Sequence, residues 1–205
     1  MSKIILFLQE SWLLVFASLM FGLLLAVAKA GLQPRITANE VEALNNKMTE
    51  LIGDADDFAL ALGGVEIATK KGKPLVTDVY QALDTEQGTV GYAFVAIGSG
   101  FADKIKIVIA VDRQFDTLLG FKVLASNETP GFGDKIKEPF FQGQFVDAPV
   151  SKLELVKVGD PEAKDEQIVA ISGATVSSDA IVSIVNAFAC SVRASVQEKG
   201  LIADE

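Results

Sequence analysis

A long apolar stretch near the N-terminus constrains this chain more than any other feature. Residues 4–28 contain one ionisable side chain, Glu10, and residues 12–28 contain none. As a helix, residues 4–28 would be roughly 37 Å long, which is enough to cross the hydrocarbon core of a bilayer. Glu10 would then lie near one interface, where Trp12 suits the aromatic belt. We therefore predict a transmembrane anchor over residues 1–30, held in membrane lipid.

A cleaved signal peptide is the alternative explanation of this stretch. Ala28 and Ala30 flank Lys29 in the small-x-small pattern of a cleavage site. The apolar run is longer than the roughly 7–15 residues of a signal peptide, however, and Glu10 lies within it. We expect a retained, single-pass anchor. Charge alone leaves its orientation open, because basic residues stand on both sides of it.

The lack of histidine and the single cysteine, Cys190, exclude several kinds of site. Without histidine there is no His-ligated haem and no Ser-His-Asp triad, and one cysteine cannot hold an iron–sulfur cluster or a structural zinc ion. The net charge of −9 repels phosphate backbones, so we expect no nucleic-acid partner. A redox cofactor would have to be organic, or a metal held by oxygens or methionine. We predict neither a metal site nor catalytic residues.

Residues 31–74 are expected to form a linker followed by a helical segment. Residues 31–37, which include Pro34, are predicted to be the linker. Residues 39–52 are predicted to form a helix, because apolar side chains recur there at helical spacing. Asn39 is its expected N-cap.

Residues 75–205 are predicted to be an α+β domain, with a mostly antiparallel sheet and helices packed on it. Segments rich in β-branched and aromatic residues indicate strands, over residues 75–83, 89–97, 105–111, 118–124 and 153–158. Residues 112–116 are expected to form a hairpin connection. Residues 179–198 are apolar nearly all round, which predicts a helix buried against the sheet. We expect Cys190 to lie on its buried face as a core residue.

A run of small and hydroxyl-bearing residues precedes that helix, with the sequence Ser172-Gly173-Ala174-Thr175-Val176-Ser177-Ser178. Gly173 and Ala174 leave room for another group to approach the backbone. A helix start also offers free N–H donors and a positive dipole end to a phosphate. The alternative is an ordinary N-cap, in which Ser177 or Ser178 caps the helix.

This run resembles the S/T-G-A-T-x-S/T flavinylation motif of the RnfG/NqrC family, whose FMN-binding domain occurs in Rnf complexes and in the sodium-translocating NADH:quinone reductase. The resemblance implies that a flavin transferase joins FMN to Thr175 through a phosphoester bond. It further implies that Ser172, Gly173, Ala174 and Ser177 shape the phosphate site. In one departure, Val169 stands where the family's sites usually have an aspartate.

A second stretch, residues 126–136, resembles the family's E-T-P-G-L-G-D-K-I loop. Pro130-Gly131 favours a turn, and the resemblance implies that Glu128, Thr129 and Gly131 contact the flavin. Many members have a histidine where this chain has Ser126. The preceding Gly91-Tyr92-Ala93-Phe94 also follows the family, so the resemblance covers roughly residues 75 to 195.

The resemblance implies an electron-transfer subunit of an Rnf-type, ion-translocating ferredoxin:NAD oxidoreductase in the plasma or inner membrane. Such a redox subunit has no independent catalysis, works beside other membrane and peripheral subunits, and carries its domain on the non-cytoplasmic side. The chain is shorter than the quinone-reductase member of the family usually is, which favours the Rnf member. The alternatives are a membrane-tethered FMN-binding sensor or relay module, and a structural anchor whose SGAT segment is unmodified.

Overall fold

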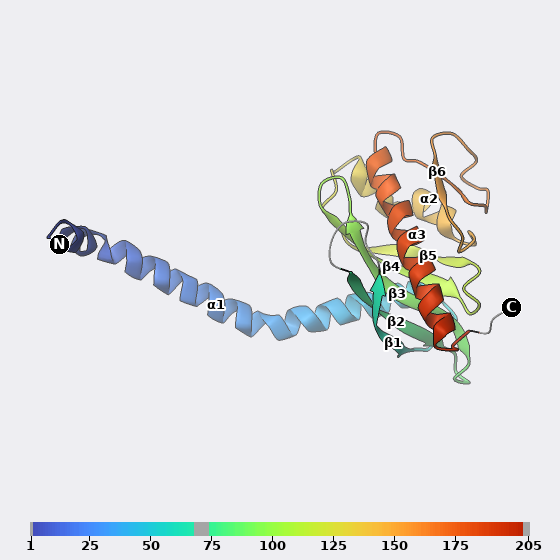
Figure 1. Ribbon diagram of the computed structural model, residues 1–205, viewed down its shortest axis with the longest axis horizontal. Helices are drawn as coiled ribbons and strands as arrows, with labels where there is room; N and C mark the ends of the chain where they lie inside the picture. The colour runs from blue at the N-terminus through green and yellow to red at the C-terminus, as the bar shows by residue number, and fades with distance from the viewer. Residues whose placement is uncertain (1, 68–73, 203–205) are drawn as a thin grey trace. The chain divides into compact units, whose positions relative to one another are not determined.

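A computed structural model describes residues 2–67 and 74–202, with side chains from residue 11 onward (Figure 1). The chain divides into two units, residues 1–43 and residues 44–205. The first unit belongs to the long helix α1 (Ser2–Leu51). From residue 11 this helix is long and apolar enough to cross a membrane, and none of its apolar stretch is buried. The predicted apolar N-terminal helix is therefore present.

The predicted linker over residues 31–37 is wrong, because these residues lie inside α1. Pro34 removes one backbone hydrogen bond, but its fixed φ of about −65° is helical, so helix formers on both sides continue the helix through it. For the same reason Asn39 is not an N-cap and residues 39–52 are not a separate helix, since the residues before Asn39 are already helical.

The second unit is built on a five-stranded sheet in the order β1-β2-β3-β4-β5, with every neighbouring pair antiparallel. The strands are β1 (Asp57–Ile67), β2 (Leu75–Leu83), β3 (Thr89–Ser99), β4 (Lys104–Asp112) and β5 (Leu118–Ala125). The four strands predicted over residues 75–124 are confirmed. The predicted hairpin connection is also present, where the Asp112 carboxylate accepts hydrogen bonds from the N–H groups of Asp116 and Thr117.

Strand β1 is not among the predicted strands, so the sheet begins earlier than the sequence pattern indicates. Its register against β2 shifts twice, between Leu60 and Leu62 and between Leu62 and Val65. Gly64 lies between these residues with a φ of +73°. These irregularities break the alternation by which a strand is recognised in a sequence.

Two short strands and three short helical segments follow β5. The predicted strand at residues 153–158 is the three-residue β6 (Glu154–Val156), which pairs in parallel with β7 (Gln167–Val169). Between β5 and β6 lie η1 (Gly133–Lys137), α2 (Pro139–Gln142) and η2 (Gly143–Phe145). They bury two phenylalanines against the sheet, since Phe141 and Phe145 pack edge-on against Phe121 with ring centroids 6.4 and 4.8 Å apart.

Each face of the sheet carries a hydrophobic cluster. One face is covered by α3 (Thr175–Glu198), whose apolar stripe packs on the strands (Figure 1). On the other face, Met48 in the last turn of α1 and Ile52 just after it pack with Ala93 and Val108. Helix α3 is apolar enough to span a membrane, but 56% of its apolar stretch is buried, which identifies it as a core helix. The predicted α+β architecture is confirmed.

The expectation that Cys190 lies in the core is wrong, because its side chain is exposed. The buried stripe of α3 includes Val185, Ala189 and Val192. Five residues after Val185, the helix has turned roughly 140° away from this stripe. Only the stripe, and not the whole helix surface, is covered.

The close pairing of β3 and β4 at Gly91 predicts a packing cost. A Cβ there would lie 2.6 Å from the Val111 carbonyl oxygen, which is backbone and cannot rotate away. We expect Gly91→Ala to lower the free energy of unfolding by about 1–3 kcal/mol. Gly143→Ala is the matched control, because Gly143 has helical φ of −62° and nothing within 4 Å of the new atom. Chemical denaturation of the detergent-solubilised chain measures both, and equal midpoints would contradict the prediction.

Candidate functional site

Thr175 is the first residue of α3, and its side chain is exposed. The residue before it, Ala174, occupies the N-cap position, and no side chain caps the helix. The backbone N–H groups of Thr175, Val176 and Ser177 have no hydrogen-bond partner among the described residues, whereas Ser178 donates to the Ala174 carbonyl at 3.0 Å. The alternative expectation of a cap by Ser177 or Ser178 is therefore wrong. The start of α3 presents free donors and a positive dipole end.

The loop before α3 is held by the buried hydroxyl of Ser178. This hydroxyl donates to the Ala174 carbonyl at 3.0 Å and accepts from the Ile171 N–H at 3.1 Å. Gly173 reverses the chain between these contacts with a φ of +80°. As a result Ser172, Gly173 and Thr175 lie on the surface while Ala174 is buried.

Glu128 joins this helix start to the second motif. Its side chain is 5% exposed, and its two carboxylate oxygens face two donors of the protein. One oxygen accepts from the Ala102 N–H at 3.0 Å, and the other accepts from the buried hydroxyl of Ser177. The two stretches recognised separately in the sequence, together with the β3–β4 hairpin, therefore meet at one buried carboxylate.

A second contact between the two motifs involves Phe132 and Gly173. A Cβ on Gly173 would lie 3.2 Å from Cδ1 of Phe132, so the ring lies directly over the bare backbone. The Thr129 carbonyl accepts from the N–H groups of Phe132 and Asp134, and the exposed Gly131 turns the chain with a φ of +77°. Phe132 stays 56% exposed, as does Val176 on the first turn of α3.

The hairpin between β3 and β4 is tied to the second motif on its outer side as well. The Asn127 amide donates to the Asp103 carboxylate at 3.0 Å. This hydrogen bond lowers the pKa of the Asp103 carboxyl below its usual value, because it favours the charged form. The contact adds to the Ala102–Glu128 hydrogen bond, so both edges of the loop are attached to the hairpin tip.

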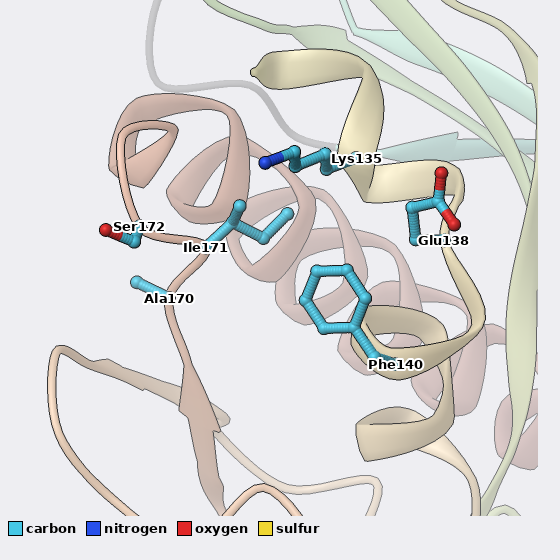
Figure 2. A pocket seen from close by; sticks show the side chains of 6 residues that line it. All are labelled: Lys135, Glu138, Phe140, Ala170, Ile171 and Ser172. Carbon is cyan, nitrogen blue, oxygen red and sulfur yellow. The ribbon is translucent and has the colours of Figure 1, made fainter. Parts of the chain in front are cut away.

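A cavity of about 330 Å³ opens between the η1–α2 segment and the residues leading into α3 (Figure 2). Lys135, Glu138 and Phe140 line it from one side, and Ala170, Ile171 and Ser172 line it from the other. Phe140 is 58% exposed. The cavity thus offers an aromatic ring and a cation beside the segment that ends in Thr175.

The structure brings the predicted site residues to one end of the domain but in different environments. Thr129 and Gly131 are exposed like Thr175, whereas Glu128 and Ser177 are buried. Val169, at the family's aspartate position, has its N–H and carbonyl paired with the side chain of Gln144 at 2.8 and 3.2 Å. The sequence analysis missed Ala102, Phe132 and Lys135, because their proximity arises only when the hairpin and η1 pack beside α3.

Within the part of the chain that the structure describes, no group of three histidine, cysteine, aspartate or glutamate side chains could hold a metal ion. One carboxylate oxygen near the site, Asp134 Oδ1, is buried and has no hydrogen-bond partner among the described residues. Buried oxygens normally have a donor. The donors and acceptors at this end of the domain are therefore suited to an organic group that carries both an anionic and a polar part.

Comparison with known proteins assigns the family. Residues 100–189 match the FMN-binding domain family. The G subunit of the ion-translocating oxidoreductase complex of Methanosarcina acetivorans is 34% identical over 173 residues, covering 84% of this chain and 87% of that protein. The chain belongs to the G-subunit family of ion-translocating oxidoreductase complexes. The matched domain runs from the β3–β4 hairpin into α3 and so includes both motifs.

Other relatives agree with this assignment. The G subunit of the Na⁺-translocating ferredoxin:NAD⁺ oxidoreductase complex of Acetobacterium woodii is 30% identical over 196 residues, covering 87% of this chain and 91% of that protein. The crystal structure of Shewanella oneidensis NqrC shares the fold, with a TM-score of 0.57 at 20% identity, over 71% of this chain and 73% of that one. FMN is the cofactor of this domain, and the apolar helix associates with a membrane.

The contact between Phe132 and Gly173 can be tested by substitution. Gly173→Ala and Gly131→Ala both place a Cβ at positive φ, which costs roughly 1–2 kcal/mol. We expect Gly173→Ala to cost more, because the space at Gly131 is open whereas Phe132 lies over Gly173. Adding Phe132→Ala to Gly173→Ala should remove the difference but not the shared loss. Thermal unfolding measures all three, and a difference that persists without the ring would refute the contact.

Proposed function

We propose that this chain carries electrons within a membrane-bound, ion-translocating ferredoxin:NAD oxidoreductase complex, through an FMN bonded to Thr175. The observation that carries the proposal is an exposed threonine hydroxyl on the uncapped first turn of α3. The names of the relatives from Acetobacterium woodii and Methanosarcina acetivorans support the complex, and the FMN-binding domain match supports the cofactor. FMN supplies the electron-transfer chemistry when bound, and the chain supplies its placement and surroundings.

The start of α3 is suited to the phosphate of a flavin nucleotide. Three backbone N–H groups without partners in the described chain lie at the positive end of the helix dipole. Gly173 presents backbone without a side chain, and Ser172 adds an exposed hydroxyl. Lys135 lines the adjacent cavity with Ser172 and brings a positive charge to a chain with a net charge of −9. These groups would stabilise the charge that remains on a phosphodiester-type linkage.

The surroundings of Thr175 are suited to a flat, largely apolar ring system. Phe132, Phe140 and Val176 are each more than half exposed, which is unusual for large apolar side chains gathered at one end of a folded domain. Thr129 and Gly131 present polar backbone and hydroxyl groups beside them. We infer that these side chains cover the ring, and that Glu128, whose oxygens are already paired, supports the site rather than contacting the ring.

Attachment at Thr175 is a group transfer in which the hydroxyl is the nucleophile. Thr175 Oγ1 forms a bond to the phosphorus of the FMN half of a phosphoanhydride such as FAD, the P–O–P bond breaks, AMP leaves, and the hydroxyl proton passes to solvent or to a base. Free FMN is a poorer donor, since it would have to expel water. This chain has no histidine, so we assign the activation of the hydroxyl to a separate flavin transferase.

A covalent bond suits the location that we propose for this domain. The apolar helix would act as a single-pass anchor in the plasma or inner membrane, with the domain on the non-cytoplasmic side. A cofactor released on that side would be lost, whereas an ester-bonded one stays in place. The other membrane and peripheral subunits of the complex are the proposed partners in electron transfer.

Substitution of Thr175 tests the attachment site. When the chain is made together with a flavin transferase, we expect a fluorescent band under ultraviolet light in a denaturing gel, because only a covalently bound flavin stays with an unfolded chain. Thr175→Ala should abolish the band and Thr175→Ser should keep it. Ser191→Ala, which removes another hydroxyl further along the same helix, is the control and should fluoresce like the wild type. Fluorescence that survives Thr175→Ala would move the attachment elsewhere.

A further inference from the structure

The buried carboxylate of Glu128 holds together three segments that are far apart in the sequence. Its own segment is the loop after β5, Ala102 belongs to the β3–β4 hairpin, and Ser177 lies on the first turn of α3. Glu128 and Ser177 are 5% and 3% exposed. A carboxylate removed from water must be compensated by donors, so this arrangement requires the Ala102 N–H and the Ser177 hydroxyl to stay in place.

Two glycines leave the space that the carboxylate occupies. A Cβ at Gly100 would lie 2.3 Å from Oε1 of Glu128, and a Cβ at Gly133 would lie 2.9 Å from Oε2 and 2.7 Å from the Ser177 oxygen. Any side chain at either position would displace the carboxylate or the hydroxyl. The pocket around Glu128 is therefore formed by the backbone of the hairpin and of the second motif, and is not an accident of loose packing.

The first turn of α3 has few other constraints. No side chain caps the helix, and the N–H groups of residues 175–177 have no partners in the described chain. Ser178 holds the preceding loop, but the side on which Thr175 and Val176 project is fixed by Ser177, which lies between them and the helix body. The hydrogen bond to Glu128 draws Ser177 inward and so directs Thr175 toward solvent.

We propose that Glu128 is a positioning residue for flavin attachment, acting through Ser177 to hold the Thr175 hydroxyl where a flavin transferase can use it. The proposal rests on the proposed attachment of FMN to Thr175. It assigns Glu128 no contact with the flavin, because both of its oxygens are paired within the protein. A carboxylate is needed since it offers two acceptors, whereas a glutamine would turn one donor group toward a protein donor.

The rate of flavin incorporation into the purified full-length chain tests the proposal. Apoprotein in detergent is mixed with flavin transferase and FAD, and initial rates are divided by the folded fraction from circular dichroism. We expect Glu128→Gln and Ser177→Ala each to lower kcat by about tenfold or more with an unchanged KM for FAD, because misplacing a reacting group slows the chemical step. The double variant should be no slower than the worse single variant, since both act through one hydrogen bond. Ser177→Thr, which keeps the hydroxyl, should recover most of the rate.

Asn186→Ala is the matched structural control. The Asn186 side chain bonds both the N–H and the carbonyl of Leu153 at 2.9 Å, so its loss should destabilise α3 away from the site. It should lower the melting temperature but not the rate for each folded molecule. Rates within twofold of wild type for Glu128→Gln and Ser177→Ala, or an equal slowing by Asn186→Ala, would overturn the positioning role alone. A wild-type chain that takes up no flavin, or a Thr175→Ala chain that does, would instead overturn the proposed function.

Discussion

A carboxylate that folding removes from water must be given hydrogen-bond donors, and in this domain that requirement connects the parts that form the site. Glu128 accepts from the Ala102 N–H of the β3–β4 hairpin and from the Ser177 hydroxyl of α3. The sheet and α3 bring these donors within reach, and glycines leave the room for them. The helix start can then remain uncapped, with its free N–H groups available to an anion, because a side chain within the turn holds it in place.

Much of the fold is predictable because its strands are regular. Strands β2 to β5 are rich in β-branched and aromatic residues and are joined by short connections, so local pattern locates them closely. The bulged β1 escapes prediction, since its register shifts hide the alternation. The continuous α1 escapes it too, because Pro34 signals a break that the neighbouring helix formers override. Both errors come from local signals that distant or flanking residues outweigh.

The attachment segment is recognisable from residues 172–178 alone, but its environment is not. Whether Ser177 caps the helix or faces Glu128 depends on a residue 49 positions away, and no local pattern encodes such a distance. The contact of Phe132 with Gly173 has the same origin. The prediction for Cys190 fails because α3 is apolar around most of its circumference, and only packing reveals which stripe is covered.

Mass spectrometry of protein purified from native membranes tests the covalent bond at Thr175 most directly. Trypsin should release the peptide between Lys164 and Arg193, which contains the whole attachment segment. The proposed chemistry predicts that this peptide is heavier by one FMN less one water, with fragmentation placing the added mass on Thr175. An unmodified peptide from native material, or flavin mass on another residue, would contradict it.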